Sequence, residues 1–173
     1  PWLRMVLVWL LIIASYAAGF VLQKHIPMIR PAALALVGTA LASIPVAGIT
    51  MYALVLHDAA LCWFITSLIG VVMYMFAAIT FKNQFLSYIS ILSLFTVSMS
   101  LPALIGAQLA WYYVVMIAFG GAMTLLSYAK IPGVPKLFVQ PIYTSSLVAV
   151  PLALFAATVS AAVLSVSEYT VVL

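Results

Sequence analysis

Charged residues are scarce in this sequence. Only 5% of its 173 residues are Asp, Glu, Lys or Arg, against 68% hydrophobic residues and a mean hydropathy of +1.35. A soluble domain carries about 25% charged and roughly 45–50% apolar residues. This chain cannot cover its surface with polar groups in water. The composition excludes a soluble enzyme and predicts a polytopic membrane protein. The net charge of +4 includes no basic run, so no nucleic-acid partner is expected.

Groups that perform chemistry are equally rare. Cys62 is the only cysteine, which excludes an intrachain disulfide, a thiolate cluster and a CxxC redox pair. Asp58 and Glu168 are the only acids, and both are expected at helix ends, away from the mid-membrane depth where an acid indicates an ion site. His25 and His57 are expected on opposite faces of the membrane, so they cannot ligate one metal or haem. The sequence therefore predicts no catalytic residue, no metal site and no bound cofactor.

Long apolar runs make up most of the chain. A membrane-spanning helix needs about 20 consecutive apolar residues, and the sequence contains six such runs. The continuous runs exclude a β-barrel, whose strands alternate. We expect an all-α bundle that forms one integral membrane domain over residues 1–173. The chain begins at Pro1, which indicates processing or a longer parent chain, and no cleavable signal peptide is expected. The six predicted spans are Trp2–Leu22, Ala32–Leu56, Ala59–Phe81, Phe85–Ile105, Leu109–Ala129 and Tyr143–Val166.

The basic residues indicate an orientation. If the spans alternate in direction, one side of the membrane carries five of the six basic residues. The positive-inside rule places that side in the cytoplasm or matrix, with both termini on the opposite side. The basic side carries Lys24, Arg30, Lys82, Lys130 and Lys136, and the other side carries Arg4, Asp58 and Glu168.

The most distinctive run is Leu101–Tyr128, which holds the adjacent pair Gly120 and Gly121 near the middle of a predicted span. Two neighbouring glycines let a helix depart from regular α-geometry. The alternative interpretation is a close-packing patch, in which Ala118 and Ala122 form a small-xxx-small pair. From the residues alone, the close-packing patch is the favoured interpretation.

The region from Lys82 to Tyr128 resembles chain 6 of respiratory complex I, NADH:ubiquinone oxidoreductase, and its bacterial counterpart. The resemblance covers about residues 62–128 and rests on a loop, a turn and a glycine-containing helix core. Gln108 stands where bacterial members often carry a carboxylate, so no proton-binding acid is transferred to this chain. The matching residues are Lys82, Asn83 and Ser87 in the loop, Leu104, Gly106 and Ala107 in the turn, and Gly120, Gly121, Met123 and Leu125 in the core.

This resemblance implies a non-catalytic membrane-arm subunit that supports proton translocation driven by NADH oxidation and ubiquinone reduction. NADH, FMN, Fe–S clusters and ubiquinone would bind to partner subunits, and the partners would be other membrane-arm subunits and lipids such as cardiolipin. The expected location is the mitochondrial inner membrane, with the bacterial cytoplasmic membrane as the alternative. Residues 59–173 would be the chain 6-like helices and residues 1–58 a two-helix extension.

The family's glycine-bearing helix carries a π-bulge that converts to regular α-helix. The resemblance therefore implies a conformational switch and a water path beside it. The expected switch residues are Ala118, Phe119, Gly120, Gly121, Ala122 and Met123. The expected water-path residues are Gln108, Tyr112, Tyr113 and Tyr128.

Two other functions fit the sequence. A small transporter or channel would need a polar lining, for which the serines at positions 90, 93, 98 and 100 are the candidates, although such hydroxyls more often bond to their own helix. A structural or assembly subunit of another membrane complex would use stripes of small residues for close helix packing. The stripes are Ala35, Thr39, Ser43 and Ala47 in the second span and Ala153, Ala157, Ala161 and Ser165 in the sixth.

Overall fold

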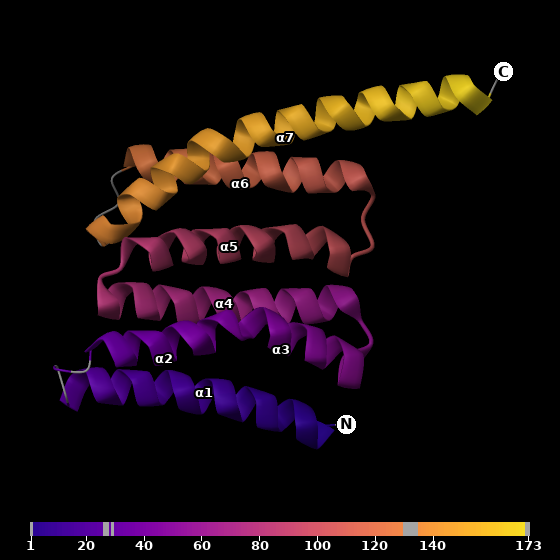
Figure 1. Ribbon diagram of the computed structural model, residues 1–173. Coiled ribbons are helices and arrows are strands. Elements are labelled where there is room, and N and C mark those ends of the chain that lie inside the picture. The colour runs from indigo at the N-terminus through magenta and orange to yellow at the C-terminus, as the bar shows by residue number, and fades with distance from the viewer. Residues whose placement is uncertain (1, 26–27, 29, 130–134, 172–173) are drawn as a thin grey trace.

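The computed structural model describes residues 2–25, 28, 30–129 and 135–171, with side chains described in these ranges except at 30 and 161–171. Within them the chain is helical, and its long helices run back and forth in sequence order, as Figure 1 shows. The elements are α1 (Trp2–His25), α2 (Arg30–Ala42), α3 (Ile44–Met51), the π-helical turn η2 (Tyr52–Leu56), α4 (Ala59–Phe81), α5 (Gln84–Leu104), α6 (Leu109–Ala129) and α7 (Lys136–Val171).

Six stretches of the described chain are long and apolar enough to cross a membrane. This confirms the all-α fold and the predicted spans, and the bounds of the third and fifth spans are those predicted from the sequence. The spans are Trp2–His25, Pro31–Leu56, Ala59–Phe81, Gln84–Leu104, Leu109–Ala129 and Lys136–Ser160.

The start of the sixth span differs from the prediction. The sequence predicts a connection up to Pro141, yet α7 begins at Lys136 and contains Pro141. The backbone N–H of Phe138 donates to the Pro135 carbonyl (2.9 Å), which starts the helix early. Downstream of the proline, the Thr144 hydroxyl bonds to the Gln140 carbonyl (2.9 Å), so local side chains support the first turns.

The second span is interrupted. α2 ends at Ala42, Ser43 forms a turn, and α3 carries Pro45 in its first turn. Because Pro45 has no N–H, it cannot donate to the carbonyl of Leu41 one turn earlier. The Tyr74 hydroxyl of α4 donates to that carbonyl instead, at 2.8 Å. The neighbouring helix α4 thus supplies the hydrogen bond that the Leu41 carbonyl lacks because of Pro45. Inside a membrane no water can supply such a bond, so a protein group must do so.

Removing the Tyr74 hydroxyl is expected to cost about 1 kcal/mol of stability, because the buried Leu41 carbonyl then lacks this donor. The measurement is thermal unfolding in detergent of Tyr74→Phe, Pro45→Ala and the double variant. In the Pro45→Ala background a backbone N–H is again present, so the cost of Tyr74→Phe should shrink. An equal cost in both backgrounds would show that the hydroxyl does not compensate for the proline.

Neighbouring helices pack in three hairpins, α1 with α2, α4 with α5, and α6 with α7, and these hairpins join side by side (Figure 1). Small residues permit the closest approaches. A Cβ atom placed on Gly19 of α1 would lie 2.9 Å from the Ala33 carbonyl oxygen of α2. The α4–α5 hairpin is the most extensive, and Ala77 and Ala78 of α4 are fully buried. It forms the centre of the bundle.

The predicted small-residue stripe on the second span does not form one packing face within this chain. Ala47 is fully buried, but Ala35 and Thr39 are exposed on the outer surface. The buried face instead includes Ala33 and Val37, because α1 approaches α2 from that side. In the sixth span Ala153 is fully buried and Ala157 is half-buried, whereas the side chains of 161 and 165 lie outside the described residues.

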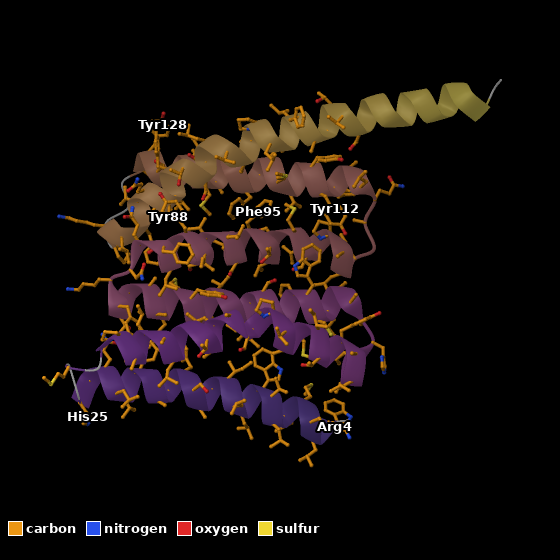
Figure 2. All side chains as sticks on the ribbon, viewed as in Figure 1. Arg4, His25, Tyr88, Phe95, Tyr112 and Tyr128 are labelled. Carbon is orange, nitrogen blue, oxygen red and sulfur yellow. The ribbon has the colours of Figure 1, made fainter. Side chains whose placement is uncertain are left out.

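The charged residues gather at the two ends of the bundle. Lys24, Lys82 and Lys136 lie where α1 and α4 end and where α7 begins, and Arg4 lies at the opposite end (Figure 2). Asp58 is at that opposite end too, where it caps α4 by accepting from the backbone N–H of Leu61 at 3.0 Å. Lys130 and the side chains of Arg30 and Glu168 lie outside the described residues. The alternation of the spans thus separates the described basic residues as predicted.

Candidate functional site

The glycine pair of α6 has two different environments. A Cβ atom placed on Gly120 would lie 2.6 Å from Val150 Cγ2 and 3.2 Å from Ala149 Cβ, both in α7, whereas one placed on Gly121 would meet nothing within 4 Å. Gly120 is therefore the point where α7 crosses α6 closely, and Gly121 faces outward. Ala118 and Ala122 are exposed, so the predicted pair of small residues does not make this contact.

The predicted π-bulge over Ala118–Met123 is not formed in this conformation, because α6 is a regular α-helix from Leu109 to Ala129. Within it the Thr124 hydroxyl donates to the Gly120 carbonyl at 2.8 Å. π-Helical geometry occurs elsewhere, in η2 at the end of the second span, where the N–H of His57 donates to the Tyr52 carbonyl at 3.2 Å. The sequence gives no glycine at that turn to predict it.

The four residues expected to line a water path do not come together. Gln108 precedes α6 and is exposed, and Tyr128 is 80% exposed near the other end of the helix. Twenty residues of α-helix separate them by about 30 Å. Tyr112 is half-buried, and the hydroxyl of Tyr113 bonds to Ser160 of α7. Figure 2 shows Tyr112 and Tyr128 far apart along α6. These residues form no common site.

The loop residues of the resemblance make the turn between α4 and α5. Lys82 has a left-handed backbone (φ 51°), and its N–H bonds to the Ala78 carbonyl, which ends α4. The Asn83 side chain accepts from the N–H of Phe85 at 2.9 Å, which starts α5. Ser87 is fully buried and donates to the Asn83 carbonyl at 3.3 Å. Lys82 and Asn83 thus cap the two helices, and Ser87 bonds back to a carbonyl of its own helix start.

The residues of the second matching turn end α5. Gly106 has a positive φ of 61°, the conformation that glycine adopts most readily. The N–H of Ala107 bonds to the Pro102 carbonyl (2.9 Å) and that of Gly106 to the Ala103 carbonyl (3.2 Å). These two bonds form a Schellman motif after Leu104. The pattern Leu-x-Gly-Ala at this point is therefore explained by helix termination.

The serines of α5 do not provide a polar lining. The hydroxyls of Ser98 and Ser100 bond to carbonyls of their own helix, Leu94 at 3.1 Å and Val97 at 2.7 Å. Ser90 is buried, and the Ser93 hydroxyl lies 3.6 Å from where a Cβ on Gly70 of α4 would be. Small side chains here let α4 and α5 approach each other.

A hollow between α5, α6 and α7 is the feature that the sequence did not reveal. It has a volume of about 510 Å³, and apolar side chains make most of its wall. The lining residues of α5 recur at the spacing of one helix face. This spacing is the sequence signal from which that wall could have been predicted. Its central lining residues are Phe85, Tyr88, Phe95, Met116, Phe119 and Val148. Figure 2 shows Tyr88 nearer the His25 end of the bundle and Phe95 near its middle.

A second hollow of about 420 Å³ lies between α3 and α4 and was also missed. Gly48 and Thr66 meet there, since a Cβ on Gly48 would lie 2.5 Å from the Thr66 hydroxyl oxygen. That buried oxygen has no hydrogen-bond partner among the described residues. Cys62 is buried beside the same hollow. Its role as a small apolar residue agrees with this position.

Comparisons with protein-family models, with curated proteins and with solved structures gave no match to this chain.

Proposed function

We propose that this chain works as a non-catalytic subunit of a membrane complex, through contacts between its outer helix faces and other membrane-embedded chains. One observation carries the proposal: many of the hydroxyls inside the spans are bonded to the chain's own helices. Tyr16 donates to the Met73 carbonyl at 2.7 Å and Tyr74 to the Leu41 carbonyl. Such bonds hold the bundle together and leave few groups for chemistry or conduction.

The finer form of the proposal places the chain in the membrane arm of complex I. Its support is the ordered series of matching residues from Lys82 to Gly121, of which the loop and turn residues also have local capping roles. In that setting the basic end would face the matrix or the bacterial cytoplasm. Conversion of Ala118–Met123 to a π-bulged form would shift Gly120 relative to Val150, so the α6–α7 crossing is where a second state would differ.

The test is purification of the tagged full chain from its native membrane in mild detergent. We expect it to migrate as part of a larger assembly that contains other membrane proteins, and, in the finer form, one that oxidises NADH with ubiquinone. A large assembly without NADH oxidation would reject complex I and keep the subunit proposal. A chain that migrates alone and conducts ions or solutes in proteoliposomes would overturn both forms.

A further inference from the structure

The hollow between α5, α6 and α7 has the length of one membrane leaflet. Its α5 wall runs from Phe85, in the first turn, to Phe95, and continues against Phe119 at the middle of α6. Ten residues of α-helix rise about 15 Å. The hydrocarbon core of a bilayer is about 30 Å thick. Along α5 the groove therefore extends from one membrane interface to about the mid-plane.

Polar and cationic residues lie at the start of α5 and of α7, near the interfacial end of the groove, and two of them, Lys82 and Gln84, also line a neighbouring hollow beside α2. The side-chain amide of Gln84 donates to the side-chain oxygen of Gln140, which ties the start of α5 to the first turns of α7. Lys82 lies two residues before Gln84, and Lys136 lies one helical turn before Gln140. Both lysines are exposed. No acid lies among the described residues of the α4–α5 turn or the first turns of α7, so both cationic charges remain uncompensated there.

We propose that this groove binds one acyl chain of an anionic glycerophospholipid from the leaflet at the basic end of the bundle. The tail lies along the aromatic and aliphatic wall, and the phosphate is held near Lys82 and Lys136. Two features select this occupant. The apolar part matches a single leaflet in depth, and the cationic residues near its interfacial end lie at the depth of the head groups, where each lysine attracts an anionic lipid. The inference does not depend on the complex to which the chain belongs.

Native mass spectrometry of the purified full chain tests the tail site. Dioleoyl phosphatidylglycerol is titrated against the natural chain, Val148→Trp and the control Val159→Trp. Val148 lines the groove and Val159 does not, and both are exposed valines of α7. We expect Val148→Trp to weaken binding by at least about tenfold and Val159→Trp to leave it unchanged, because an indole fills the groove.

A second filling variant, Leu152→Trp, is placed deeper in the same wall and should also weaken binding. Unfolding temperatures of the variants, read through exposure of the buried Cys62 thiol, show that the bundle is intact. Equal phosphatidylglycerol binding by both filling variants and the control would overturn the tail site.

The head-group contact is tested with Lys82→Asn and Lys136→Gln. Asn tolerates the left-handed backbone at position 82, so this change removes charge with little effect on the turn. Each substitution should weaken binding of dioleoyl phosphatidylglycerol by about fivefold and leave binding of dioleoyl phosphatidylcholine unchanged. A natural chain that binds the two lipids equally would reject an anionic head group as the ligand.

Discussion

Replacing Gly120 by leucine is expected to destabilise the chain, whereas the same change at Gly121 is expected to leave its stability unchanged or slightly higher. At Gly120 even the first added carbon would meet Val150 Cγ2 at 2.6 Å and the backbone nitrogen of Val150 at 3.3 Å. Overpacking of this kind costs about 1–3 kcal/mol. At Gly121 there is open space, and leucine is the better helix former.

The measurement is thermal unfolding in detergent. A thiol-reactive fluorophore that labels Cys62 as it becomes exposed reports the unfolding. Cys62 is the only cysteine and is 3% exposed, so labelling reports loss of the bundle. Gly120→Leu should lower the unfolding temperature by several degrees relative to Gly121→Leu. Equal unfolding temperatures would mean that α7 does not cross α6 at Gly120. The pair is a matched control, because both positions lie on one helix at the same depth.

This comparison also bears on the conformational hypothesis for α6. The sequence makes Gly120 and Gly121 look alike, and both were expected to loosen the helix. Their surroundings separate the roles, since only Gly120 touches α7. In the described conformation, the role of Gly120 is a packing contact with α7. A switch at Ala118–Met123 therefore requires α7 to move with it.

The spans were predictable because hydropathy and length alone define them. Helix ends were predictable where a local residue fixes them: Asp58 and Asn83 cap the starts of α4 and α5, and Gly106 ends α5. These signals act within a few residues of the chain. The start of α7 was missed because the helix begins at Lys136 and continues through Pro141, which the sequence alone suggested would precede it.

The parts that depend on distant residues could not be predicted. The buried face of α2 is set by the approach of α1, which places Val37 inside and Thr39 outside. The hollow lined by Phe95 and Phe119 exists because α7 leans across α6 and α5 at an angle that no local pattern specifies. Each of these helices carries hydrophobic residues on every face, so the periodicity of the sequence says little about which face is buried.

A close helix contact in the first hairpin, at Gly19, gives the second large prediction. A Cβ atom on Gly19 would lie 2.5 Å from Val37 Cγ2 and 2.9 Å from the backbone oxygen of Ala33. A backbone oxygen cannot turn aside as a side chain can, so α1 and α2 must separate to admit any larger residue. Gly38, on the outer surface of α2, has nothing within 4 Å and provides the matched control.

We expect Gly19→Leu to lower the unfolding temperature by at least as much as Gly120→Leu, and Gly38→Leu to keep or raise it. The hairpin also carries Tyr16, whose hydroxyl bond to the Met73 carbonyl joins α1 to α4. Displacing α1 at Gly19, one turn from Tyr16, should weaken that bond too. Tyr16→Phe should therefore cost less in the Gly19→Leu background than in the natural chain, and an equal cost would show that α1 keeps its place on α4.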